Sequence, residues 1–226
     1  QWYQFLRQNY LTLILFKDIL LNYEIRDSRN LLRLTQYLAA TNTSTQSIAS
    51  ISTNLGIKKE TVSNYIRYLE EAFLIAPATF FTASPTKALR RNNKIYFTDI
   101  ALTQALHSTF ASQSEAETNK IVENLIFQEL RAFYMAQTNT EFPTIHYWKN
   151  KYEVDFIIKL QETILPIEIK YSNQITSRDM RGLIQFCNHF QVGDGIMISK
   201  DAFETIKISD DLTIHLIPAM IFSLLI

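Results

Sequence analysis

The sequence predicts an α+β protein with two domains, a winged helix-turn-helix domain followed by an α/β domain. Three observations lead to this prediction. Two helical patterns meet at Gly56, strand-like apolar runs follow one another between 144 and 171, and the charge changes sign along the chain. Residues 26–98 carry ten Lys and Arg against four Asp and Glu, whereas residues 99–226 carry ten against sixteen. A basic block followed by an acidic one indicates two domains with different roles.

Composition narrows the class of protein. The 226 residues suffice for one large or two small domains, and the single cysteine, Cys187, excludes an intramolecular disulfide and fits a reducing compartment. No Gly-rich phosphate loop is present, and the apolar run 11–16 is far shorter than the ~20 residues of a membrane-spanning helix. We therefore expect a cytoplasmic protein that does not enter membranes. Because the sequence opens at Gln1 inside a helical pattern, we expect it to be a fragment of a longer protein.

The N-terminal part is predicted to be helical. Residues 1–25 have the apolar spacing of a helix, and we interpret them as a connector from a missing N-terminal ATPase domain. A second helical pattern covers residues 28–40, with Ser28 as its expected N-cap.

A helix-turn-helix follows. A short helix at 47–55, a turn at Gly56 and a longer helix at about 59–73 have the order and lengths of this motif. Two expected strands, 74–81 and 95–98, and the basic loop between them would form a wing. The predicted winged-helix domain spans residues 26–114.

The exposed polar positions of the second helix and the cations of the wing suit contacts with DNA phosphates and grooves. The expected contacts are Lys59, Ser63, Asn64 and Arg67 on the helix, and Lys87, Arg90, Arg91 and Lys94 on the wing. A winged helix that contacts proteins, with a merely solvated basic face, remains an alternative.

The predicted second domain covers residues 115–226. Its expected elements are a long helix, a meander of three strands, a second helix, two further strands and a C-terminal helix after Pro218. The long helix is expected at 117–137, the strands of the meander at 144–149, 152–160 and 163–171, and the second helix at 176–190. The two further strands are expected at 196–199 and 213–217.

Three charged residues stand out on the meander. Asp155 lies in its second strand, and Glu168 and Lys170 share one face of its third strand because side chains alternate. Two carboxylates can hold Mg²⁺, and a lysine can stabilise charge that develops on an attacked phosphate. The alternative is a salt bridge on a solvated sheet face.

This order of elements, with Asp in one strand and Glu-x-Lys in the next, resembles the PD-(D/E)xK nuclease superfamily over residues 115–200. The resemblance implies a restriction-endonuclease-like fold in which Asp155 and Glu168 bind Mg²⁺ and Lys170 assists the attack on the phosphodiester. A helical glutamate often completes such a site, and Glu123 is the match. The proline of the motif is absent, since Val154 stands before Asp155.

Nearly the whole chain resembles the C-terminal region of bacterial and archaeal AAA-type ATPases. The matching phrases lie at 16–27, 56–74, 94–99, 123–127 and 153–170. The resemblance implies a DNA-engaging region with a Mg²⁺-dependent cleavage site, which reaches ATP only through the missing N-terminal half. Its partners would be DNA, its own ATPase domain and further copies of the chain. The alternative is an inactive nuclease fold that binds partners or assembles the ATPase.

Overall fold

The structure, a computed structural model, describes residues 2–23, 25, 27–106, 114–138, 140 and 144–226. The chain forms two compact units, residues 1–77 with 92–113 and residues 78–91 with 114–226. The first unit therefore differs from the predicted winged-helix domain in two ways. It includes residues 1–25, and it lacks residues 78–91, which belong to the second unit.

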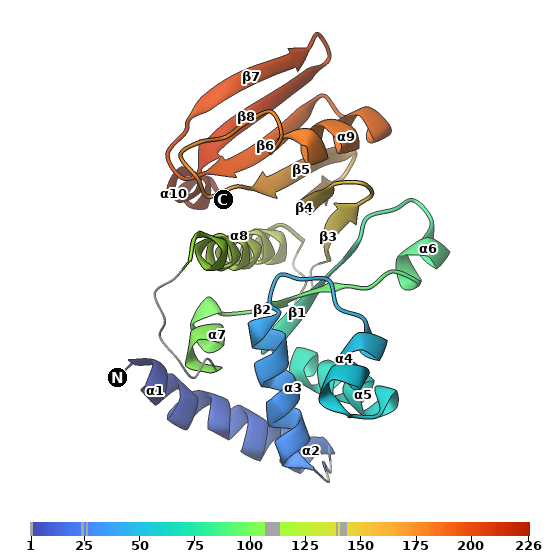
Figure 1. The fold of residues 1–226 in the computed structure, drawn as a ribbon, viewed down its shortest axis with the longest axis vertical. Coiled ribbons are helices and arrows are strands. Elements are labelled where there is room, and N and C mark those ends of the chain that lie inside the picture. Colours follow the sequence, from blue (N-terminus) through green and yellow to red (C-terminus); the bar gives the residue numbers. More distant parts are fainter. Residues whose placement is uncertain (1, 24, 26, 107–113, 139, 141–143) are drawn as a thin grey trace. The chain divides into compact units, whose positions relative to one another are not determined.

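The first unit is mainly helical, as Figure 1 shows for the blue and cyan part of the ribbon. Besides the first half of β1 (Ile75–Phe80), it contains a strand, a series of α-helices and two π-helical turns. These are α1 (Trp2–Leu6), η1 (Arg7–Leu11), η2 (Ile14–Ile19), α2 (Leu20–Tyr23), α3 (Ser28–Ala40), α4 (Ile48–Leu55), α5 (Lys59–Glu71), β2 (Lys94–Phe97) and α7 (Ile100–Leu106).

The N-terminal helical stretch is part of the first unit's core. Leu11, Leu15 and Ile19 are almost completely buried and belong to the same apolar cluster as α3 and α5. These residues recur at every fourth position, so they lie on one face of the helix. The described residues of the stretch 1–25 thus pack as part of this unit, and their role as a connector to an ATPase domain stays a prediction.

The second unit is built from helices on a mixed sheet. Its elements, besides residues Ala78 to Phe80 of β1, are α6 (Pro85–Leu89), α8 (Glu115–Thr138), β3 (Ile145–Lys149), β4 (Glu153–Leu160), β5 (Thr163–Ile169), α9 (Arg181–Phe190), β6 (Asp194–Ser199), β7 (Glu204–Ser209), β8 (Leu212–Pro218) and α10 (Ala219–Leu225).

The strands of this unit follow the order β1-β3-β4-β5-β6-β8-β7, and β2 neighbours β1. β3, β4 and β5 form the predicted antiparallel meander, and β6 pairs with β5 in parallel. The mixed α+β prediction is confirmed. The sequence prediction omitted β7, whose alternating exposed and half-buried residues pair only with β8 at the sheet edge.

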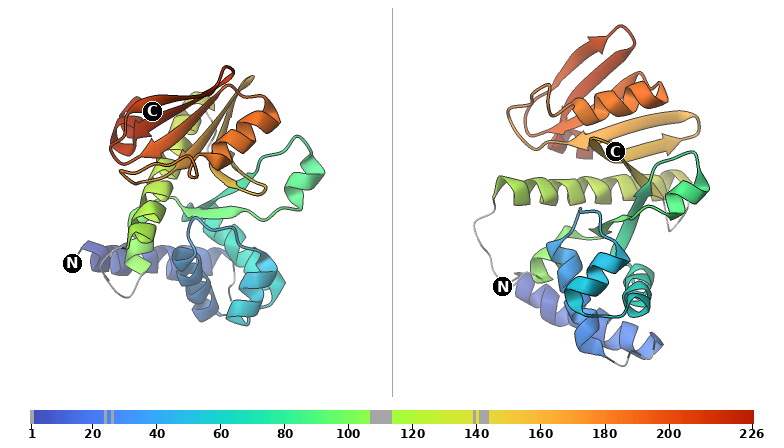
Figure 2. Two further views of the ribbon diagram at one scale, coloured as in Figure 1. Left: turned by 45° about the horizontal axis from the view of Figure 1, so that its top comes forward. Right: turned by 45° about the vertical axis from the view of Figure 1, so that its right-hand side comes forward.

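Helices α8 and α9 cover opposite faces of these strands (Figures 1 and 2). Phe127 of α8 packs against Phe156, and Phe186 of α9 packs against Trp148. Large aromatic side chains at both contacts bury much apolar area and fix the sheet between the two helices.

The predicted basic loop of the wing contains a short helix, α6. Ser84 caps it by accepting a hydrogen bond from the Lys87 backbone N–H at 3.4 Å, and Pro85 begins the helix. Ser at the N-cap and Pro at the first helical position are both favoured there. The loop prediction was therefore wrong for residues 85–89.

Candidate functional site

The predicted helix-turn-helix consists of α4 and α5. Ser47 caps α4 by accepting from the backbone N–H of Ser50 at 3.0 Å. The helix ends at Gly56, which has a φ of 68°, in the left-handed region that glycine adopts without strain. The chain can therefore reverse sharply into α5, whose buried residues Val62 and Leu69 face the core of the unit.

The start of α5 is exposed and carries two lysines and one glutamate, Glu60. Lys58, Lys59 and Ser63 are exposed, whereas Asn64 is half-buried. No side chain caps the first backbone N–H groups of α5, in contrast to α3 and α4. A helix N-terminus with unsatisfied N–H groups attracts anions, and lysines add to this attraction.

Asn64 differs from its neighbours in its surroundings. It lines a groove of about 450 Å³ within the first unit, together with residues of α5 and of the segment 23–30. The other lining residues are Tyr23, Ile25, Asp27, Asn30, Gly56, Ile57, Lys58, Thr61, Tyr65 and Tyr68. Sequence reasoning placed Asn64 with Lys59 and Ser63 on a single surface.

Arg67 is engaged within its own helix. Its Nη1 lies 2.9 Å from Oε1 of Glu71, and its guanidinium lies 4.8 Å from the ring centre of Tyr68. Glu71 also accepts a hydrogen bond from the Tyr23 hydroxyl, and this bond is the main reason that the pKa of Glu71 lies below its usual value. The positive charge of Arg67 is therefore already shared with a carboxylate.

The cations predicted for the wing are placed differently from one another. Lys87, Arg90 and Arg91 are exposed around α6, in the second unit. Lys94 lies in β2 of the first unit and is only 2% exposed. The prediction that Lys94 contacts DNA was wrong, because the side chain is enclosed in the protein and cannot reach a phosphate.

Asp155 and Glu168 do come together in the second unit. The register of β3 on β4 shifts between the pairs His146–Ile157 and Trp148–Val154, which places Asp155 at an irregularity of β4. Its carboxylate accepts from the Ile169 backbone N–H at 3.0 Å, and the Glu168 carboxylate accepts from the Asp155 N–H at 3.3 Å. Irregularities of this kind commonly redirect a side chain next to a site.

Lys170 lies near these carboxylates but contacts another one. Its Nζ is 3.6 Å from Oδ1 of Asp179. Burial raises the pKa of Asp179, but hydrogen bonds from Thr176 and the charge of Lys170 outweigh burial and lower it overall. The backbone N–H and the hydroxyl of Thr176 both donate to Oδ2, at 2.9 and 2.6 Å.

Glu168 and Lys170 line a polar cleft of about 340 Å³ at the end of β5. The other residues of this cleft are Asn119, Tyr152, Glu153, Ile169, Arg178, Asp179 and Gly182. Asp155 is 8% exposed and is not among them, and neither is Glu123, which is half-buried on α8.

The metal prediction therefore rests on two carboxylates. In the part of the chain that the structure describes, no three or more His, Cys, Asp or Glu side chains are grouped so as to hold a metal ion. Glu123 is thus not part of a three-carboxylate centre. Asp155 and Glu168 are linked by the hydrogen bond from the Asp155 backbone N–H to the Glu168 carboxylate.

Sequence reasoning missed several residues of the cleft. Asn119 accepts a hydrogen bond from the Tyr171 backbone N–H at 2.8 Å and so ties α8 to the end of β5. Asn119 lies one helical turn before Glu123 and therefore on the same face of α8. The helical spacing that pointed to Glu123 could have pointed to Asn119 as well. Asp179 could have been found from Thr176, since a Thr followed three residues later by an acid commonly forms a local capping arrangement.

The fold thus defines an α+β protein that joins a helix-turn-helix unit to a mixed-sheet unit. The chain belongs to the family described as domain of unknown function DUF8612, whose model matches residues 1–113, half of the chain. Residues 118–222 match a second domain of unknown function, DUF4143, which is usually found at the C-terminus of AAA ATPases.

The chain is 27% identical over 177 residues to the uncharacterized protein MJ1544 of Methanocaldococcus jannaschii. The match covers 72% of this chain and 38% of that protein, so the chain spans well under two thirds of its relative's length.

The solved structures are those of MepR from Staphylococcus aureus. The MepR–DNA complex gives a TM-score of 0.27 at 22% identity, covering 55% of this chain and 87% of that chain. MepR itself, a transcription regulator of the multidrug efflux pump MepA, gives a TM-score of 0.27 at 21% identity. This match covers 61% of this chain and 87% of that chain. Scores this low do not establish a shared fold.

Each helix in the described residues is too short or too polar to cross a membrane.

Proposed function

We propose that this chain is the DNA-engaging C-terminal region of an AAA-type ATPase, and that α5 is the element that contacts duplex DNA. The observation that carries the proposal is the exposed, basic and uncapped start of α5 directly after the left-handed turn at Gly56. The usual position of DUF4143 at the C-terminus of AAA ATPases supports the ATPase context.

The first turn of α5 has the chemistry to hold a phosphate. The residue before its first turn makes no side-chain cap, and Lys58 and Lys59 add two positive charges at the same end of the helix, against one negative charge on Glu60. Ser63 lies one turn from Lys59 on the exposed face and can donate to a phosphate or a base edge. Arg67 contributes less, because Glu71 already occupies its guanidinium.

The test is a titration of a labelled 20-base-pair duplex with the 226-residue chain at several salt concentrations. Each phosphate contact contributes roughly −0.9 to the slope of log affinity against log salt. The variant K58Q/K59Q should therefore bind more weakly and lose about 1.8 from the slope. The matched control is R7Q/K17Q, which removes the same charge from exposed positions of the same unit. Equal slopes for parent and K58Q/K59Q would contradict the proposal.

A second candidate function is metal-dependent cleavage of a phosphodiester by the second unit. The observation that favours it is the approach of Asp155 and Glu168 across β4 and β5, next to a cleft that also contains Lys170. Mg²⁺ is often held by one or two carboxylates, with water and substrate phosphates as its other ligands. These two side chains would hold the ion, which would polarise the phosphodiester when bound.

Calorimetry with Mn²⁺ tests the metal site. We expect one binding event that is lost in D155N and in E168Q, because both carboxylates are needed. Nicking of supercoiled DNA in Mg²⁺ should be lost in K170A, whereas K200A, an exposed lysine outside the cleft, should retain it. Metal binding that survives both carboxylate substitutions, or equal nicking by K170A, would instead favour a module that binds partners or assembles the ATPase.

A further inference from the structure

We infer that the turn around α6 is a second, sequence-independent binding site for the phosphate backbone of DNA, separate from the helix-turn-helix. The inference depends on the proposed function in one respect, since it takes DNA as the partner. Its residues nevertheless belong to the second unit, whereas α5 belongs to the first. The proposals of DNA contact at α5 and at α6 can therefore be tested independently of each other.

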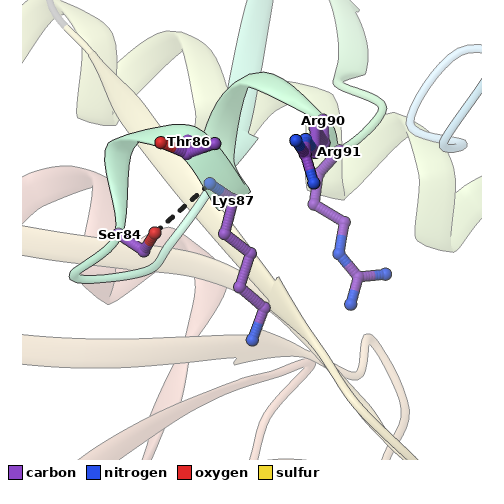
Figure 3. Close-up of a pocket in the computed structure, with 5 residues that line it drawn as sticks. All are labelled: Ser84, Thr86, Lys87, Arg90 and Arg91. Atoms are coloured by element: carbon purple, nitrogen blue, oxygen red, sulfur yellow. Dashed lines mark hydrogen bonds between the residues drawn. The ribbon is translucent and has the colours of Figure 1, made fainter.

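The α6 turn forms a hollow of about 460 Å³. Ser84, Thr86, Lys87, Arg90 and Arg91 line this hollow, and Figure 3 shows them around the short helix. Three of these side chains are cations and two carry hydroxyl groups, so the lining contains donors of hydrogen bonds and no carboxylate. This combination selects for an anion with several oxygen atoms.

Two of the cations lie near the same aromatic ring. The Nζ of Lys87 lies 6.0 Å from the ring centre of Phe80, and the guanidinium carbon of Arg91 lies 4.9 Å from the same centre. Phe80 is buried in β1 and is therefore a fixed platform. Cation–π attraction to this ring reduces the freedom of both side chains before any ligand arrives.

The structure shows no counter-charge for the turn among the residues that it describes. In the described part of the chain, no salt bridge joins an acidic side chain to Lys87, Arg90 or Arg91. Three neighbouring cations without a counter-charge repel one another, and a phosphate between them removes this repulsion. The planar guanidinium of arginine also matches two phosphate oxygens at once.

The lining indicates recognition of the backbone and not of bases. Phe80 is covered and offers no exposed ring on which a base could stack. The described residues that line the hollow carry hydroxyl groups or positive charges. Contacts to phosphates position a protein on DNA but carry no sequence information directly. The site should thus bind duplexes of different sequence with the same affinity.

The experiment compares the parent chain with K87Q/R90Q/R91Q in titrations of a labelled 20-base-pair duplex at 50 to 200 mM salt. The matched control is K120Q/K159Q/K200Q, which removes the same charge from exposed positions of the same unit. Loss of three contacts should reduce the salt slope by about 2.7. Over this fourfold salt range the parent should lose roughly 40-fold more affinity than the α6 variant does.

Each outcome of these titrations either supports or contradicts the phosphate site at α6. A reduced slope in the α6 variant, a parental slope in the control and equal effects on two duplexes of unrelated sequence support the site. Equal losses in variant and control would show an effect of net charge only, and a parental slope in the α6 variant would exclude contact there. If K58Q/K59Q leaves binding unchanged while the α6 variant weakens it, the α5 proposal fails and this one stands. The reverse result overturns only the α6 site.

Discussion

Replacing Gly182 by alanine should destabilise the second unit. Gly182 is the second residue of α9, and a Cβ at this position would lie 2.2 Å from the carbonyl oxygen of Glu153 and 3.6 Å from Cγ2 of Val154. Non-bonded heavy atoms are optimally separated by roughly 3.5 Å, so α9 would have to move away from β4 by about 1 Å. The obstacle is backbone, so it cannot rotate aside as a side chain could.

The expected loss of stability in G182A follows from two opposing effects. Forcing an extra carbon into a packed contact costs about 1–3 kcal/mol, whereas alanine in a helix is favoured over glycine by at most ~1 kcal/mol. The net loss should be about 1–2 kcal/mol, which lowers the melting temperature by roughly 2–8 °C for a chain of this size. The substitution removes no polar contact, so the loss reports the close approach of α9 to β4.

Trp148 provides the signal, because its ring lies 5.5 Å from that of Phe186 in α9. In a W2F background, its fluorescence would follow urea and thermal unfolding of G182A and of the control G195A. At Gly195 the nearest atoms to a Cβ are side-chain atoms at 3.6 Å, an ordinary contact, so G195A should match the parent closely. A G182A protein as stable as the parent would refute this reasoning.

Three further predictions concern single side chains. S47A should lower the unfolding free energy of the first unit by about 1 kcal/mol in urea titrations, because the Ser50 N–H loses its cap. Burial lowers the pKa of His146, and Lys159 lowers it further, so below pH about 6.5 the unfolded chain binds the proton more readily. The parent should therefore lose stability relative to H146Q as the pH falls through this range, and parallel curves would contradict the assignment. Burial raises the pKa of the Cys187 thiol to about 11, so iodoacetamide at pH 8 should label it only after unfolding, which mass spectrometry can test.

Much of the architecture could be predicted from local patterns. The turn at Gly56 and the meander of β3, β4 and β5 follow from residue spacing, since helix and strand periods differ and glycine tolerates a positive φ. The edge strand β7 was missed although Ile206 and Ile208 alternate with polar residues, which is a strand pattern. Such a short alternation is a weak signal, and the pairing with β8 that completes the strand is not visible in it.

The wing shows that local sequence patterns do not reveal strand pairing between distant segments. Residues 74–98 have the pattern of a hairpin, and this pattern does not show that Ala78 to Phe80 also pair with β3. That pairing joins residues separated by more than sixty positions in the chain, so no local signal could reveal it. Lys94 is a similar case, because this buried residue forms a β-bridge with Thr45, which lies in a distant segment of the sequence.

The candidate cleft shows why spacing predicts proximity better than it predicts chemistry. Alternation along β5 correctly brought Glu168 and Lys170 to one cleft, and strand pairing brought Asp155 to Glu168. The partner of Lys170 is instead Asp179, whose second oxygen is fixed by Thr176. A lysine that already shares its charge with a carboxylate stabilises a developing phosphate charge less well than one that does not. Catalysis by Lys170 would therefore require this ion pair to open when substrate binds, whereas a partner-binding or assembly role would leave it closed.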